Sequence, residues 1–232
     1  MIHYLRDFIS LIYPELCNCC GQNLHHNETI ICTHCLAQLP VRNDHQNSQN
    51  ELLQLFWGRV PLKGAFAYLD FKKGSKIQTL LHRLKYQQQA AIGIWLGFQH
   101  GLLLKENPIY QKIDYIIPVP LHHSKEKLRT YNQSQKYAEG LALATQKTVS
   151  INHLIRTHAG LSQTQKTRME RISDTKSIFT FKNNQNMNNK HLLLVDDIIT
   201  TGATIEACCT EILKNTPNIT LSVATIALTK DL

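Results

Sequence analysis

Two adjacent carboxylates followed by a hydroxyl-rich turn are the residues of this chain best suited to bind a ligand. Asp196 and Asp197 follow the apolar residues 192–195, and they precede Thr200, Thr201 and Gly202. From Ala203 onward the apolar residues recur with helical spacing, at Ile205, Cys208, Cys209, Ile212 and Leu213. The stretch 192–204 therefore predicts a buried strand that ends at the two acids, a polar turn and a helix.

A turn of this kind has the chemistry of a phosphate site. The first backbone N–H groups of a helix lack intrahelical partners and can bind an anion. The hydroxyls of Thr200, Thr201 and Thr204 add donors, and Gly202 allows close backbone approach. The carboxylates would repel a phosphate but can accept hydrogen bonds from sugar hydroxyls beside it. A ligand-free strand and capped helix would explain the apolar residues but not the two acids, so we predict a phosphate-and-ribose site.

The stretch LLLVDDIITTGAT, residues 192–204, resembles the signature of type I phosphoribosyltransferases, which use 5-phosphoribosyl-1-pyrophosphate (PRPP). The resemblance implies that Asp196 and Asp197 are the catalytic acids and hold the two ribose hydroxyls. It implies a 5′-phosphate loop made of Thr200, Thr201, Gly202, Ala203 and Thr204. It also implies Mg²⁺ on the pyrophosphate of PRPP, where the metal neutralises the leaving group.

A second cluster of reactive residues lies near the N-terminus. Cys17 and Cys20 form one CxxC pair, and Cys32 and Cys35 form another. Two such pairs can complete a tetrahedron of thiolates, and this spacing favours structural zinc over disulfides. Reduced thiols without a metal are the alternative. Cys19 is left over, and three nearby histidines are better explained as surface residues: His25, His26 and His34.

The elements that position these residues alternate between strand and helix. Strands are predicted at 64–71, 115–118, 153–155, 178–181, 192–195 and 219–228, with the last at an edge of the sheet. Helices are predicted at 76–86, 89–104 and 133–144, and over much of 1–16. This alternation indicates an α/β fold with a largely parallel sheet and right-handed crossovers. Ligands bind at the carboxyl ends of the strands in such sheets, where the two acids are expected.

A cationic turn follows the predicted strand at 115–118. It contains Lys125 and Arg129, and Asn132 then begins a helix with Gln135 as its capping-box partner. The segment PVPLH…LRTYNQ, together with the CxxC pairs and the acid-containing loop, resembles the ComF/GntX family of competence-associated proteins. Thr130 and Tyr131 stand where that family usually has glycine and phenylalanine.

The ComF/GntX resemblance extends over nearly the whole chain. It implies a phosphoribosyltransferase-like parallel sheet flanked by helices, with a small N-terminal zinc-binding segment. Residues 84–86, LKY, match the family's lysine-containing segment, and 157–175 match a catalytic flap in which Arg168 and Arg171 supply cations. A solvated surface helix of mixed charge is the alternative for 157–175. Asp174 stands where asparagine is common. Lys125, Arg129, Arg168 and Arg171 would then contact pyrophosphate, and the family's link to natural transformation implies contact with single-stranded DNA and DNA-uptake proteins.

Length and charge agree with this interpretation. The 232 residues carry a formal charge of +8, and the part after residue 50 has 23 basic and 13 acidic residues, an excess of +10. Such a charge suits a polyphosphate ligand, a nucleic acid or a plain solvated surface.

We expect a helix and zinc segment at 1–45, a connector at 46–63 and the main domain at 64–232. With neither a signal peptide nor a transmembrane segment recognised, we expect a cytoplasmic location. A phosphoribosyltransferase of a small molecule, with no DNA role, is the alternative function.

Overall fold

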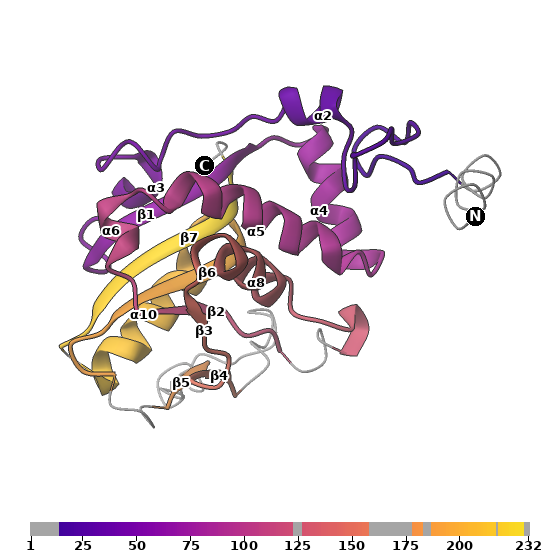
Figure 1. Cartoon of the computed structure of the whole chain (residues 1–232). Helices are drawn as coiled ribbons and strands as arrows, with labels where there is room; N and C mark the ends of the chain where they lie inside the picture. The colour runs from indigo at the N-terminus through magenta and orange to yellow at the C-terminus, as the bar shows by residue number, and fades with distance from the viewer. Residues whose placement is uncertain (1–13, 123–126, 158–177, 183–186, 217, 230–232) are drawn as a thin grey trace.

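A five-stranded sheet, in the order β1–β7–β6–β2–β3, forms the centre of the molecule (Figure 1). The computed structural model describes residues 14–122, 127–157, 178–182, 187–216 and 218–229. All neighbouring strands of this sheet run parallel. The strands are β1 (Leu62–Phe71), β7 (Thr220–Thr229), β6 (His191–Ile199), β2 (Tyr115–Pro118) and β3 (Thr148–Val149). The predicted α/β class with a parallel sheet is confirmed.

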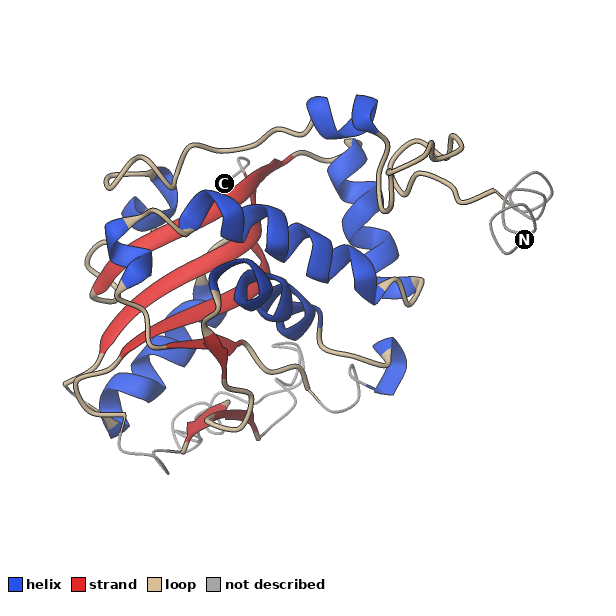
Figure 2. Cartoon of the chain, viewed as in Figure 1, coloured by secondary structure: helices blue, strands red, loops and turns tan. Residues whose placement is uncertain are grey.

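Helices cover both faces of the sheet (Figure 2). The pleat of β6 shows why: Leu193 and Val195 point into one core, and Leu192 and Leu194 point into the other. The first core contains residues of α4 (Lys76–Tyr86), α5 (Ala90–Leu104), α6 (Pro108–Gln111), α8 (Gln133–Thr145) and the short α2 (Thr33–Ala37). The second contains residues of α3 (Glu51–Gln54) and α10 (Ala203–Asn215).

A separate antiparallel pair, β4 (Leu154–Arg156) and β5 (Phe179–Phe181), packs into the second core. These strands were predicted within one or two residues of their observed bounds, but they do not join the main sheet. They flank residues 158–177, so the predicted flap with Arg168, Arg171 and Asp174 lies outside the described residues.

Two details of the predicted sheet are wrong. The last strand is not an edge, because β7 lies between β1 and β6. Its side chains are buried from Leu221 to Leu228, as expected for an inner parallel strand covered on both faces. The strand before the acids does not end at Val195, because β6 continues to Ile199 along β7 after its pairing with β2 has stopped at Pro118.

The two predictions for the N-terminus of α8 have different outcomes. Asn132 does cap α8, since its side-chain oxygen accepts a hydrogen bond from the Ser134 N–H at 3.0 Å. Gln135 does not complete a capping box, because its amide donates to Glu139 at 3.1 Å instead. Most of the helix predicted over 1–16 lies outside the described residues, and Leu16 forms a β-bridge with Asn23.

Candidate functional site

The two acids lie at the carboxyl end of β6, where the shorter β2 has already ended. Asp196 Oδ1 accepts hydrogen bonds from the Ser134 hydroxyl at 2.9 Å and from the Asp197 N–H at 2.8 Å. The second carboxylate is held differently, because Asp197 Oδ2 lies 2.9 Å from Lys85 Nζ and its Oδ1 accepts the Ile198 N–H at 2.7 Å. The ends of β6, α8 and α4 therefore meet at one half-buried acid pair.

The charges of this pair are balanced in two ways. Burial and the neighbouring Asp197 charge raise the pKa of Asp196 to about 7, against the lowering effect of its hydrogen bonds and of Lys85. Two carboxylates side by side favour uptake of a proton or a cation. Lys85 supplies the cation at Asp197, and Asp196 holds a proton more readily than an ordinary aspartate.

The predicted phosphate loop connects β6 to α10. Thr200, Thr201, Ala203 and Thr204 are exposed, whereas Gly202 is buried and has a left-handed φ of 75°. A Cβ atom at Gly202 would lie 2.8 Å from the Phe56 ring, so the connector closes the back of this loop. The four exposed residues leave their polar groups accessible on the other side.

An arginine of the connector fixes the loop from outside. Arg59 donates to the Thr201 carbonyl at 2.8 Å, and its Nε donates to the Glu206 carboxylate at 3.0 Å. Its guanidinium also lies 5.6 Å from the centre of the Phe56 ring. Because it pairs with Glu206, Arg59 reduces the negative charge in the first turn of α10, next to the proposed phosphate position.

The structure brings together only part of the predicted set. Asp196, Asp197 and the loop from Thr200 to Thr204 lie in one continuous segment. Arg129 contacts Tyr86 and Gln133 rather than either acid, and Lys125, Arg168 and Arg171 lie outside the described residues. The predicted site set lacked Lys85 and Ser134, although LKY and the capped helix start already marked their surroundings in the sequence.

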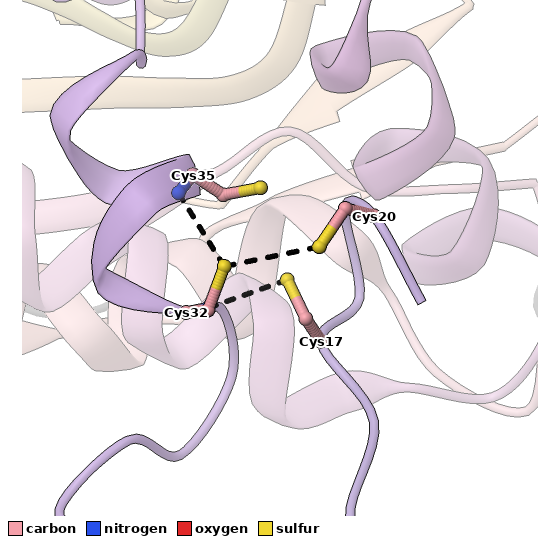
Figure 3. A group of neighbouring side chains, drawn as sticks. All are labelled: Cys17, Cys20, Cys32 and Cys35. Atoms are coloured by element: carbon pink, nitrogen blue, oxygen red, sulfur yellow. Dashed lines mark hydrogen bonds between the residues drawn. The ribbon is translucent and has the colours of Figure 1, made fainter. Parts of the chain in front are cut away.

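The four predicted metal ligands do converge (Figure 3). The sulfur atoms of Cys17, Cys20, Cys32 and Cys35 all lie within 4.8 Å of one another. Cys20 Sγ and Cys32 Sγ are 3.8 Å apart. Tetrahedral zinc–thiolate bonds of about 2.3 Å would place neighbouring sulfur atoms about 3.8 Å apart. The cluster thus has the ligand number, ligand type and spacing of a closed structural metal site.

The surroundings of the cluster favour the thiolate of Cys17 but not that of Cys35, whose pKa is raised well above its ordinary value by burial and by the neighbouring cysteines. The Cys32 N–H donates to Cys17 Sγ at 3.3 Å, and the Cys35 N–H donates to Cys32 Sγ at 3.4 Å. Burial opposes ionisation of Cys17, but hydrogen bonds from neighbouring backbone groups outweigh it and lower the pKa of Cys17 to about 6. Cys19 has the opposite environment, since burial and nearby thiolates raise its pKa to about 11. Cys19 does not belong to the four-sulfur cluster.

One helix connects the cysteine cluster with the acid pair. At the start of α4, Lys76 Nζ lies 3.5 Å from Cys35 Sγ and 2.8 Å from the Gln38 side-chain oxygen. Near its end, Arg83 donates to the Asn18 side chain at 3.3 Å, and Lys85 contacts Asp197. The cysteines Cys17, Cys32 and Cys35 also share the first core with α4, so the metal segment is packed onto the main body.

Known proteins with similar sequences carry names connected with competence and with DNA utilization. The chain is 25% identical over 198 residues to competence protein F of Haemophilus influenzae, covering 82% of this chain and 74% of that protein. It is 25% identical over 142 residues to DNA utilization protein YhgH of Salmonella typhimurium, covering 60% of this chain and 62% of that protein. The chain is thus similar to competence protein F over most of its length. The predicted ComF resemblance is thereby confirmed, and no family model matches the sequence.

Among solved structures, the chain matches part of an allosteric regulatory enzyme of purine biosynthesis and part of glutamine phosphoribosylpyrophosphate amidotransferase from B. subtilis. Each is 19% identical, with a TM-score of 0.39 and coverage of 59% of this chain. The chain spans about a quarter of each solved chain, at 25% and 26%. In the part of the chain that is described, none of the helices is both long and apolar enough to span a bilayer.

Proposed function

We propose that this protein binds PRPP with Mg²⁺ and acts in DNA uptake for natural transformation. The observation that supports it best is the acid pair next to the exposed loop. Asp196 and Asp197 offer carboxylate oxygens for ribose hydroxyls, and Thr200 to Thr204 offer amides and hydroxyls for the 5′-phosphate. Lys85 pairs with Asp197 at 2.9 Å and so places a cation beside the acid pair.

The remaining ligands follow from the same proposal. Mg²⁺ would be carried on the pyrophosphate of PRPP, where it neutralises charge. Lys125, Arg129, Arg168 and Arg171 are proposed to contact the pyrophosphate. Zinc is the metal proposed for the four cysteines, since an all-thiolate tetrahedral set suits it. Single-stranded DNA and proteins of the uptake machinery are the proposed partners, on the basis of the +10 charge excess and the names of the relatives.

Calorimetry with PRPP and Mg²⁺ tests the small-ligand part. The double variant Asp196→Asn with Asp197→Asn should bind PRPP more weakly, by on the order of 1–3 kcal/mol for each lost acceptor. The variant Asp114→Asn is a matched control, because Asp114 is an acid beside His191 at the opposite end of β6. Equal PRPP affinity of the double variant and the wild type would refute the site.

The alternative is a phosphoribosyltransferase that modifies a small molecule and has no DNA role. The intact acid pair and loop favour ligand binding in either case, so they do not separate the two functions. Pyrophosphate release in the presence of a candidate acceptor would support the enzyme. Salt-sensitive binding of a single-stranded oligonucleotide, without pyrophosphate release, would support the DNA-uptake role.

A further inference from the structure

An exposed aromatic pair lies on α4, directly beside the lysine that holds Asp197. The apolar face of α4 is buried through Ile77, Leu80, Leu81 and Leu84. Tyr86 takes no part in that core and remains 57% exposed. The His82 ring, one helical turn earlier and also exposed, lies 4.9 Å from the Tyr86 ring, centre to centre, with a 45° tilt.

A second segment places a cation against this ring. The Arg129 guanidinium carbon lies 5.4 Å from the centre of the Tyr86 ring, and Arg129 also donates to the Gln133 side chain at 3.0 Å. The Tyr131 hydroxyl donates to the Leu84 carbonyl, which ties the segment before α8 to the end of α4. Ring and guanidinium are thus held together by two elements that both reach the acid pair, α4 through Lys85 and α8 through Ser134.

We propose that Tyr86, with His82 and Arg129 beside it, is a stacking platform for a base of single-stranded DNA. Proteins that bind single strands combine aromatic rings, on which bases stack, with cations that follow the phosphates. Both parts are present here, since Arg129 lies against the Tyr86 ring and Lys85, the preceding residue of α4, carries a second cation near it in the chain. The bases of a duplex are already stacked on one another, whereas a single strand leaves them free to meet the platform. This inference rests on the proposed role in DNA uptake.

Tyr131, two residues after Arg129, is less suited to stack against a base. Its hydroxyl is bound to a backbone carbonyl and its ring is half-buried in contact with the first core. Tyr86, which the sequence marks only as the residue after Lys85, has the accessible ring. The location next to Asp197 places the platform at the edge of the proposed PRPP site.

Fluorescence anisotropy with two labelled oligonucleotides of equal length tests the platform, one with normal bases and one with abasic sugars only. Tyr86→Leu should weaken binding of the normal strand by roughly tenfold and leave binding of the abasic strand unchanged. Tyr86→Phe should retain wild-type affinity, because the ring is kept. A plot of log affinity against log salt concentration should have the same slope in wild type, Tyr86→Leu and Tyr86→Phe. The reason is that the uncharged Tyr86 side chain neutralises no DNA phosphate.

Phe98→Ala is the matched control, because it removes a partly exposed ring from α5 on which none of the described arginines and lysines stacks. Thermal unfolding of each variant confirms that the fold is kept. Equal affinity of Tyr86→Leu and wild type for the normal strand overturns the platform and leaves the proposed function standing. Weakening of the normal and abasic strands alike also overturns it. Wild-type protein that binds neither strand at low salt overturns both the platform and the DNA part of the proposed function.

Discussion

At the scale of single residues, the proposed ligand-binding role of the acid pair comes with a cost in stability. Asp196 takes up a proton more readily in the folded chain than in the unfolded one, because burial and Asp197 raise its pKa. A native group that binds protons more tightly than its unfolded form destabilises the protein as pH rises. For Asp196 this loss develops between the ordinary aspartate pKa of about 4 and the folded value near 7.

Asp196→Asn should therefore stabilise the protein at neutral pH while it weakens PRPP binding. The asparagine oxygen can still accept hydrogen bonds from the Ser134 hydroxyl and from the Asp197 N–H. The amide is neutral without taking up a proton, so no buried charge forms as pH rises. We expect a gain on the order of 1 kcal/mol at pH 8 that shrinks toward pH 4. Chemical denaturation of variant and wild type at several pH values measures the difference. A variant that is less stable than wild type at pH 8 would contradict the assigned environment of Asp196.

Gly202 joins two separate constraints at one position. Its φ of 75° disfavours any side chain, and a Cβ would meet the Phe56 ring. Gly202→Ala should cost about 2–4 kcal/mol and weaken PRPP binding, because either the loop or Phe56 must move. Gly74 has a similar φ of 80° and open space around it. Gly74→Ala should thus show only the backbone cost, about 1–2 kcal/mol, with unchanged PRPP affinity. Calorimetry and thermal unfolding of both variants separate the two effects.

At the residue scale, the sequence predicted candidate site residues best where all of them lie in one short motif. Two acids before TTGAT and two CxxC pairs are contiguous signals, and the structure places the four cysteines together as expected. Contacts between distant segments were not visible in this way. Lys85 meets Asp197 across 112 positions of the chain and Arg59 reaches Glu206 across 147, so only the folded topology brings them into contact.

At the scale of elements, the position of α8 depends on a close crossing with α5. A Cβ atom at Gly140 would lie 2.0 Å from the Ile94 carbonyl oxygen, and one at Gly97 would lie 2.1 Å from the Tyr137 carbonyl oxygen. The backbones of the two helices are therefore in direct contact. This contact fixes α8, whose first turn carries Ser134 to Asp196.

Gly140→Ala should destabilise the protein by more than about 3 kcal/mol, even though alanine is the better helix former by about 1 kcal/mol. The helices must separate, because the contact atom is backbone. Gly93→Ala on the same face of α5 would meet side chains of Lys136 and Leu84, at 2.9 and 3.1 Å, and should cost less. Urea denaturation gives both values, and a stabilised Gly140→Ala protein would show that the crossing is looser than described.

Element boundaries followed periodicity closely, whereas sheet order did not. The bounds of α4 and β2 are those predicted, because a regular apolar pattern and clear flanking residues define them. The place of β7 between β1 and β6 depends on which strand pairs with which, and an all-apolar strand suits any inner position. The strands β4 and β5 were predicted, but their separate pairing was not, since three-residue strands carry too little pattern to assign a partner.

At the scale of the whole molecule, α4 links the proposed metal site with the proposed PRPP site. Lys76 and Arg83 contact the cysteine segment, and Lys85 contacts Asp197 two residues further on. If the metal orders the cysteine segment, its loss should release these contacts and shift the end of α4. Metal binding and PRPP binding are then coupled through one rigid element.

Cys20→Ser tests this coupling with little disturbance of the core, because Cys20 is the exposed member of the cluster. The variant should lose its zinc, which is expected at one ion per chain in the wild type, and bind PRPP roughly fivefold more weakly or worse. Cys19→Ser is the matched control, since it alters a neighbouring thiol outside the cluster and should keep both zinc and PRPP affinity. Metal analysis and calorimetry on the same samples provide the two measurements.

Lys85→Met should weaken PRPP binding as well. Adding Cys20→Ser to Lys85→Met should reduce the PRPP binding free energy by less than the sum of the two single losses, because both changes act through one contact. Unchanged PRPP affinity in zinc-free Cys20→Ser protein would show that α4 holds Lys85 in place without help from the metal.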